Sequence, residues 1–373
     1  MLTNAAQAQT FQQHTGMTHV ADRQSNPVAL LSLATAVPKT ILSQDEATRF
    51  ARRLFGNHAG LFDQLAGVFQ NTGIAKRHIV RPPEWYEGDH GWSARNQVYL
   101  ESAEELYIES ARKALDQAGV RAEEVDTLVT VSTTGIATPR LEARVAGRMG
   151  FRQDAERVPV FGLGCAGGVS GLALASRLAA SGPDRVVLSV TIELCTISIR
   201  LDRPSKANIV ATALFGDGAA ACVVRSGGGG VAAIKGGSQI LWPDTLDIMG
   251  WTVDDPGLGV VFDRSIPPFV EEHMAEAVAR MAHGIGIGTQ HIQRFICHPG
   301  GAKVVAALES SLELQTGTLD HERAVLRDYG NMSAPTVLFV LDRVLEEGMP
   351  DNSLLLALGP GFTASGLLLT RPQ

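Results

Sequence analysis

An internal repeat is the strongest restriction on how this chain of 373 residues folds. Residues 215–218 read Phe-Gly-Asp-Gly and lead into an apolar run at 219–225, while residues 358–361 read Leu-Gly-Pro-Gly and lead into another at 362–371. In both places a glycine turn precedes a segment with the composition of a buried strand. This repetition predicts two copies of one supersecondary unit.

Both copies also contain a helix-forming stretch that opens just after a residue able to do chemistry. Cys165 precedes one such stretch at 166–180, and Asn331 precedes another at 334–347. Apolar runs without polar alternation, typical of strands buried on both faces, occur at residues 127–131, 186–192 and 354–358. Because helical and strand patterns alternate along the chain, the sequence predicts an α/β fold.

Two compositional breaks divide the chain. Residues 1–26 are polar and rich in Gln, Thr and Ala, and we expect a disordered tail there. Four glycines at 227–230 are poorly suited to regular structure and are interpreted as the connector between the copies. We therefore predict an N-terminal half over residues 27–226 and a C-terminal half over residues 231–373.

Capping signals predict two helix starts in the N-terminal half. Ser43 with Glu46 forms a Ser-x-x-Glu box before a helical run, and Ser102 with Glu105 forms a second box before a run that ends at Gly119. Each box supplies a side-chain acceptor for a backbone N–H that a helix start leaves unpaired.

The charge and cysteine patterns exclude several classes of function. The formal net charge is -7, and Lys and Arg are scattered, so we expect neither nucleic acid nor an anionic membrane as a partner. No apolar run is long enough for us to expect membrane insertion, and the first 26 residues lack the features of a signal peptide. The four cysteines have no metal-ligand spacing, which indicates reduced thiols and a cytoplasmic location.

Cys165 is the candidate nucleophile. It follows an apolar strand pattern and precedes the helical stretch, so its thiol lies at a helix N-terminus, where unpaired N–H groups favour a thiolate. A small buried core cysteine is the alternative. The same stretch matches GxGxxG through Gly162, Gly164 and Gly167, but it comes late in the chain and only Glu193 follows as a ribose partner, so dinucleotide binding is disfavoured.

His298 and Asn331 are the candidate partners of this cysteine. His298 ends an apolar strand pattern before Pro-Gly-Gly, and Asn331 follows Tyr-Gly in a tight turn. Taken singly, a packed histidine and a helix-capping asparagine are the simpler interpretations. Together with Cys165 at the end of a third strand they can converge on one centre. There His298 can form an ion pair with the thiolate, and His298 and Asn331 can hold an enolate oxygen while a thioester loses carbon dioxide, with no metal or organic cofactor.

Five motifs in the same order resemble the chalcone synthase-like type III polyketide synthases. They are Gly-Cys-Ala-Gly-Gly at 164–168, Phe-Gly-Asp-Gly-Ala-Ala at 215–220, His-Pro-Gly-Gly at 298–301, Tyr-Gly-Asn-Met-Ser at 329–333 and Gly-Pro-Gly at 359–361. The resemblance covers residues 29–369 and is greatest to bacterial alkylresorcinol and alkylpyrone synthases. It implies a thiolase-like, five-layered αβαβα fold built from two duplicated halves, a homodimer, and a centre of Cys165, His298 and Asn331.

The resemblance also implies a substrate pocket. Phe215 matches an aromatic gatekeeper, whereas the second gatekeeper is replaced at Val260 or Val261, which predicts a slimmer gate. Cys195 and Ser198 fall where plant relatives place cavity threonines.

Two further residues are predicted to bind substrate. Ser333 belongs to the motif around Asn331 and is counted with the substrate-binding residues. The basic residues that hold coenzyme A phosphates in plant relatives are missing around residues 64–71, and Lys303 is the substitute candidate.

The sequence thus predicts an acyltransferase that condenses malonyl-CoA onto an acyl-CoA starter, with a long fatty acyl starter and an alkylresorcinol or alkylpyrone product. One alternative is a short-starter or malonyl-only synthase of the phloroglucinol or polyhydroxynaphthalene type. A ketoacyl synthase is disfavoured by the context of Asn331. A third alternative is a non-catalytic thiolase-fold partner protein.

Overall fold

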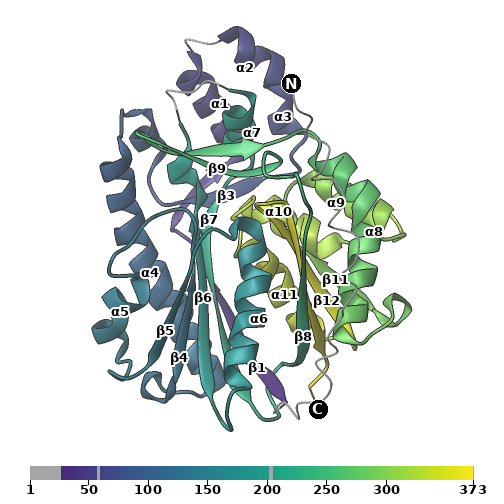
Figure 1. Ribbon diagram of the computed structural model, residues 1–373. Helices are drawn as coiled ribbons and strands as arrows, with labels where there is room; N and C mark the ends of the chain where they lie inside the picture. The colour runs from purple at the N-terminus through teal and green to yellow at the C-terminus, as the bar shows by residue number, and fades with distance from the viewer. Residues whose placement is uncertain (1–26, 57–58, 201–204, 373) are drawn as a thin grey trace, which may run out of the picture.

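The repeat seen in the sequence appears as a repeated order of strands. The computed structural model describes residues 27–56, 59–200 and 205–372, and nine of its strands form one mixed sheet (Figure 1). The strands of the first half are, in spatial order, β1 (Val28–Ala36), β7 (Asp217–Ser226), β6 (Val186–Leu194), β4 (Thr127–Val131) and β5 (Glu156–Val160). The strands of the second half are β8 (Ala232–Leu241), β13 (Thr363–Thr370), β12 (Ser353–Gly359) and β11 (Arg294–Cys297). The expected tail lies outside the described residues.

The two sets of strands pair in the same way. In the first, β1 to β7 and β7 to β6 are antiparallel and β6 to β4 is parallel. In the second, β8 to β13 and β13 to β12 are antiparallel and β12 to β11 is parallel. A short antiparallel ladder between β1 and β8, from the pair Val28 and Ile234 to the pair Leu30 and Ala232, joins the sets. This matched pairing is what duplication of one α/β unit produces.

Helices complete five layers. Two helices cover the outer face of the first set, α4 (Trp92–Ala118) and α5 (Leu141–Met149), and two cover the outer face of the second set, α8 (Ile266–Ile285) and α9 (Ala302–Ser311). Between the sets lie α6 (Gly167–Ala179) and α11 (Thr336–Glu347), whose apolar faces share one core with strands of both halves (Figure 1). The predicted αβαβα architecture is confirmed.

The remaining elements form a cap at one end of the layers. Its helices are α1 (Gln44–Leu54), α2 (Ala59–Leu65), α3 (Gly67–Gln70) and α7 (Lys206–Leu214). Its two small antiparallel sheets pair β2 (Thr40–Ser43) with β3 (Lys76–Ile79) and β9 (Met249–Asp254) with β10 (Gly257–Phe262). Helix α10 (Asp320–Tyr329) runs toward this end beside α11. Short 3-10 turns occupy Pro83–Glu87, Ala122–Glu124, Gly164–Ala166, Cys195–Ser198 and Thr289–His291.

One predicted helix start is right and one is wrong. At α1 the hydroxyl of Ser43 accepts from the N–H of Glu46, and the Glu46 carboxylate accepts from the N–H of Ser43. Ser102 instead lies in the middle of α4, which begins at Trp92 and ends at Gly119 with φ 63°. Because the buried face of α4 already starts before Ser102 and packs on the sheet, tertiary contacts extend the helix through the local capping signal. Among the helices of the described residues, none has the length and apolar character needed to cross a membrane.

Candidate active site

Cys165 lies in the turn between β5 and α6. It occupies a 3-10 turn, Gly164–Ala166, and its side chain is buried. The glycines around it allow close packing: a Cβ on Gly164 would stand 2.6 Å from Pro360, and one on Gly168 would stand 2.3 Å from the carbonyl oxygen of Ala334. These glycines therefore allow the turn to pack directly against the second half of the chain.

His298 follows the last residue of β11. Its backbone N–H donates to the carbonyl of Leu356 on β12 at 2.8 Å, which continues the parallel ladder by one residue and directs the chain toward the cap. The imidazole is buried, and neither ring nitrogen has a hydrogen-bond partner among the described residues. Burial lowers the pKa of His298 to about 3, so the ring is neutral.

Asn331 lies in a turn of the second repeat whose backbone forms hydrogen bonds with the first repeat. Its N–H donates to the carbonyl of Leu214 at 2.8 Å, and its own carbonyl accepts from the N–H of Gly216 at 3.0 Å. The side-chain amide donates to the carbonyl of Gly300 at 3.1 Å, and its oxygen accepts from the N–H of Ser333 at 2.8 Å. Asn331 is therefore not a helix cap, because α11 begins only at Thr336 and its N-cap is Pro335.

The three candidate residues converge on one cavity of about 540 Å³. Cys165, His298 and Asn331 all line it, although they come from three different turns. Most of the other lining side chains are apolar, and they include Leu65, Val68, Val210, Leu214, Met274 and Leu308. A nucleophile beside an imidazole and an amide donor in an apolar cavity can hold an acyl group and stabilise an enolate.

Burial favours the neutral forms of both Cys165 and His298. It raises the pKa of the Cys165 thiol to about 11, and the hydroxyl of Ser333, 3.4 Å from Sγ, opposes that rise only in part. Among the described residues His298 makes no hydrogen bond to the sulfur. Because two charges are costly to create in a buried place, these shifts favour a thiol and a neutral imidazole over the ion pair expected from the sequence.

The predicted gate residues form a cluster of their own. Phe215, Cys195 and Val260 pack together, with Val261 next along β10, and none of these four lines the large cavity. Ser198 donates to the carbonyl of Cys195 at 2.6 Å and faces a small separate recess. The cluster lies against the wall of the large cavity, because Leu214 and Phe262 belong to the cluster and also line the cavity.

Two aromatic residues missing from the predicted site complete this cluster. The ring of Phe262 lies 5.7 Å from that of Phe215, and the ring of Trp251 lies 6.2 Å from it, measured between centroids. Phe262 also lines the cavity. An aromatic ring of β10 thus lies beside Phe215, although the sequence has valine at both matched positions, Val260 and Val261. The signal that could have identified Phe262 is an aromatic residue two positions after Val260, since residues two apart lie on the same face of a strand.

Three cations line the outer part of the same cavity. Lys303 belongs to the first turn of α9, Lys206 begins α7, and Arg264 precedes α8. All three are exposed, and none forms an ion pair with another described residue. Only Lys303 was predicted, because the other two come from segments that show no motif.

Comparisons with known proteins agree on one family. The family model for the N-terminal domain of chalcone and stilbene synthases matches residues 16–228, and the model for their C-terminal domain matches residues 233–371. The chain is 38% identical to the 1,3,6,8-tetrahydroxynaphthalene synthase of Streptomyces peucetius, over 91% of this chain and 92% of that protein. It is 34% identical to a putative chalcone synthase of Bacillus subtilis, over 91% of this chain and 98% of that protein.

A solved structure shows the same likeness. The crystal structure of the 1,3,6,8-tetrahydroxynaphthalene synthase from Streptomyces coelicolor superposes with a TM-score of 0.87 at 30% identity. The match covers 92% of this chain and 99% of that one.

Proposed function

The chain belongs to the chalcone and stilbene synthase family of type III polyketide synthases, and from that premise we propose that it builds an aromatic polyketide from malonyl-CoA, with malonyl-CoA or a short acyl-CoA as its starter. Members of this family are acyltransferases that join carbon atoms by decarboxylative condensation. The proposal differs from the long fatty acyl starter expected from the sequence and adopts the alternative stated there.

Two observations support a short starter: the enzymes that this chain is similar to, and the aromatic cluster beside the cavity. Two relatives with 38% and 32% identity are tetrahydroxynaphthalene synthases. Phe215, Trp251 and Phe262 pack together, and Phe262 also lines the cavity, so this wall of the site is built from bulky aromatic rings. A filled wall of this kind favours short acyl groups, since pocket volume limits the size of a bound chain.

The proposed reaction begins at Cys165. Its Sγ attacks the thioester carbonyl of the starter, the thiol proton passes to the neutral imidazole of His298, and coenzyme A leaves as a thiol after taking that proton. The product is an acyl group bound to Cys165 through a new thioester. The neutral state of His298 supports this role, because a protonated ring could not accept the proton.

Extension uses the two remaining residues. Malonyl-CoA loses carbon dioxide and leaves an enolate, whose oxygen accepts from a ring N–H of His298 and from the amide of Asn331. The enolate carbon then attacks the acyl thioester, forms the new carbon-carbon bond and releases the Cys165 thiolate. These steps need no metal or organic cofactor, because the thioester itself stabilises the charge.

We assign the phosphates of coenzyme A to the cations at the cavity mouth. Lys206, Arg264 and Lys303 line the outer part of the cavity that contains Cys165, and Lys303 lies at the N-terminus of α9, where the helix dipole adds to its charge. The thioester end of such a substrate would reach inward to Cys165. Ser333 would contact the acyl group, because its hydroxyl lies beside Sγ.

We also propose a homodimer that works in the cytoplasm. Strand β5 is an edge of the nine-stranded sheet, and no described strand pairs with its outer side. Phe161, which follows it, is 51% exposed. A second copy that adds its own edge strand would pair the free backbone groups and cover the ring.

A fatty acyl starter remains a second candidate because the cavity is largely apolar. Side chains such as Val68, Met274 and Leu308 can contact a hydrocarbon chain without loss of hydrogen bonds.

Purified protein should be incubated with malonyl-CoA alone and with acyl-CoA starters from acetyl to stearoyl, while coenzyme A release and product masses are followed. We expect polyketide products from malonyl-CoA alone or with short starters. Long-chain resorcinols or pyrones at higher kcat/KM would favour the second candidate. Absence of coenzyme A release under every condition would contradict catalysis altogether and leave the non-catalytic partner protein.

A further inference from the structure

Strand β11, which leads to His298, is the other edge of the nine-stranded sheet. On one side it pairs with β12. Toward its other side the N–H of Cys297 faces no strand, and Cys297 is fully buried. A buried N–H without an acceptor would destabilise this edge.

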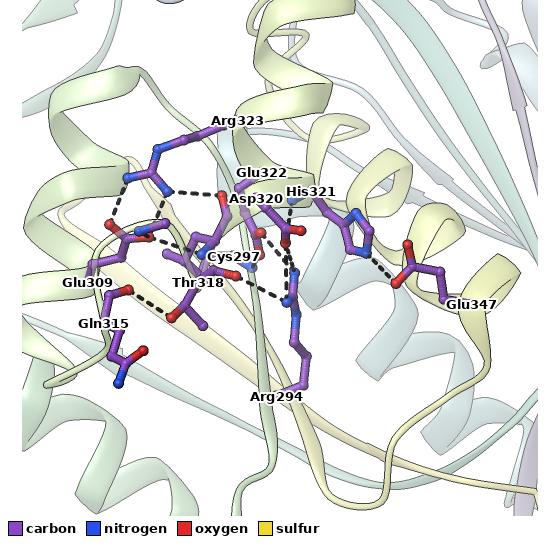
Figure 2. Close-up of polar contacts among 12 residues, drawn as sticks. Arg294, Cys297, Glu309, Gln315, Thr318, Asp320, His321, Glu322, Arg323 and Glu347 are labelled. Atoms are coloured by element: carbon purple, nitrogen blue, oxygen red, sulfur yellow. Dashed lines mark hydrogen bonds and ion pairs between the residues drawn. The ribbon is translucent and has the colours of Figure 1, made fainter.

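The acceptor is a buried carboxylate from another element. Oε1 of Glu322 accepts from the N–H of Cys297 at 2.9 Å, and Glu322 has no exposed surface (Figure 2). Its second oxygen, Oε2, lies 3.2 Å from Nη2 of Arg294 at the other end of the same strand. Arg294 also donates to the carbonyl of Thr318 at 3.1 Å. Glu322 therefore contacts both ends of the short strand β11.

Glu322 lies in the first turn of α10, and α10 leads directly through Gly330 to Asn331. The residue that Glu322 contacts on β11, Cys297, immediately precedes His298. One carboxylate thus joins the segment that carries the imidazole to the helix that carries the amide. The proposed enolate needs both donors directed at one oxygen, and a misplacement of about 1 Å costs about 100-fold in rate.

We infer that Glu322 is a positioning residue, which holds His298 and Asn331 in register for malonyl-CoA decarboxylation through its bond to Cys297. The inference rests on the proposed function and deepens it. Cys165 lies on a separate turn between β5 and α6, and among the described residues it has no hydrogen bond to Glu322 or Cys297.

A second buried carboxylate nearby provides a matched control. Glu309 accepts from the N–H groups of Gly317 and Leu319, both at 3.0 Å, and pairs with Arg323 (Figure 2). It has the same chemistry as Glu322, with backbone acceptors and an arginine partner. It closes the loop between α9 and α10, and its hydrogen bonds go to Gly317, Leu319 and Arg323 and not to Cys297.

The test compares Glu322→Ala, Glu322→Gln and Glu309→Gln with the wild type. For each protein the thermal midpoint, the rate of Cys165 alkylation by iodoacetamide, and kcat and KM for malonyl-CoA decarboxylation are measured. We expect Glu322→Ala to lower kcat about 10- to 100-fold, with KM within about twofold and Cys165 alkylation lowered much less than kcat. Glu322→Gln keeps an acceptor for the Cys297 N–H and should recover most of kcat. Glu309→Gln should retain the wild-type kcat whatever its thermal midpoint.

Three outcomes separate the inference from the proposed function. Wild-type kcat in folded Glu322→Ala, or an equal loss of kcat in Glu309→Gln, overturns the positioning role and leaves the synthase intact. If Glu322→Ala does not fold, Glu322→Gln decides the question. This variant keeps an acceptor for the Cys297 N–H, so a kcat lowered about 10- to 100-fold in it also overturns the positioning role. A wild type that releases no carbon dioxide from malonyl-CoA overturns the proposed function and with it this inference.

Discussion

The hydroxyl of Ser333 donates a hydrogen bond to Sγ of Cys165, with 3.4 Å between the oxygen and the sulfur. Ser333 has φ 57°, a left-handed conformation that is costly for a residue with a side chain. Its N–H is held by the side-chain oxygen of Asn331. A strained serine thus connects the proposed nucleophile to the proposed enolate donor.

Substitution of this serine should make the thiol less acidic. In Ser333→Ala the Cys165 thiolate loses a hydrogen-bond donor, and we expect the apparent pKa of the thiol to rise by about one unit. Alkylation by iodoacetamide at pH 8 should fall about tenfold. Ser365→Ala, which removes a buried hydroxyl bonded to Ser170 instead, is the control and should keep the wild-type rate. Equal rates in Ser333→Ala and the wild type would show that the bond has no effect on the thiolate.

Removal of the nucleophile should separate the two halves of the reaction. We expect Cys165→Ala to abolish chain extension, since no acyl group can be bound, while decarboxylation of malonyl-CoA by His298 and Asn331 continues. The thermal midpoint should change little, because the lost side chain is small. Cys222→Ala alters a buried thiol that does not line the cavity and should keep full activity. Robust polyketide formation by Cys165→Ala would rule out the nucleophile assignment.

The pH dependence of alkylation should report a neutral resting thiol. Because burial raises the pKa of Cys165 to about 11, the thiolate fraction and the alkylation rate should rise about tenfold per pH unit from pH 7 and continue to rise above pH 9. A plateau below pH 7 would instead indicate the thiolate-imidazolium pair.

The same shift affects stability with a definite sign. A thiol pKa that is higher in the folded state than its ordinary 9.0 means that the folded protein holds the proton more tightly. Its contribution to the free energy of unfolding is present below pH 9 and is lost as the pH rises toward 11. The decline in stability over that range should be weaker in Cys165→Ala, measured by chemical unfolding at each pH.

A smaller side chain at Trp251 should widen the starter range. Trp251→Gly removes a ring that packs on Phe215 beside Cys195, and we expect the kcat/KM ratio of hexanoyl-CoA over acetyl-CoA to rise about tenfold or more. Val253→Gly changes an exposed residue of the same strand and should leave the ratio unchanged. Val260→Phe adds bulk to the cluster and should lower the ratio. If the kcat/KM ratio is the same as in the wild type in both Trp251→Gly and Val260→Phe, the aromatic cluster does not select the starter.

The cations at the cavity mouth should affect only substrates with phosphates. In Lys206→Gln/Lys303→Gln we expect KM for malonyl-CoA to rise about fivefold or more, with kcat unchanged and a weaker dependence on salt. A malonyl thioester of pantetheine, which has no phosphate, should react equally with the variant and the wild type. Lys235→Gln, at an exposed lysine outside this cavity, should behave as wild type. If the KM of the phosphate-free substrate rises as much, the cations do not bind phosphate.

Local signals were enough to predict that Cys165, His298 and Asn331 meet at one site. Cys165 and Asn331 follow glycine turns, and His298 ends a buried strand, and each of these features depends on residues within a few positions along the chain. The same applies to the capping box at Ser43. Where tertiary packing competes with a local signal, as at Ser102 inside α4, the prediction was wrong.

The sequence by itself determined an α/β protein with a repeated unit, and it determined which three residues stand at the turns of that unit, because buried strands, helices and glycine turns are specified by local residue patterns. Only the tertiary structure decided what surrounds them. The packing of Trp251 and Phe262 on Phe215 and the bond from Glu322 to Cys297 join segments that are distant along the chain. The raised pKa of Cys165 arises from burial, which depends on the whole fold and not on the residues beside the cysteine in the sequence.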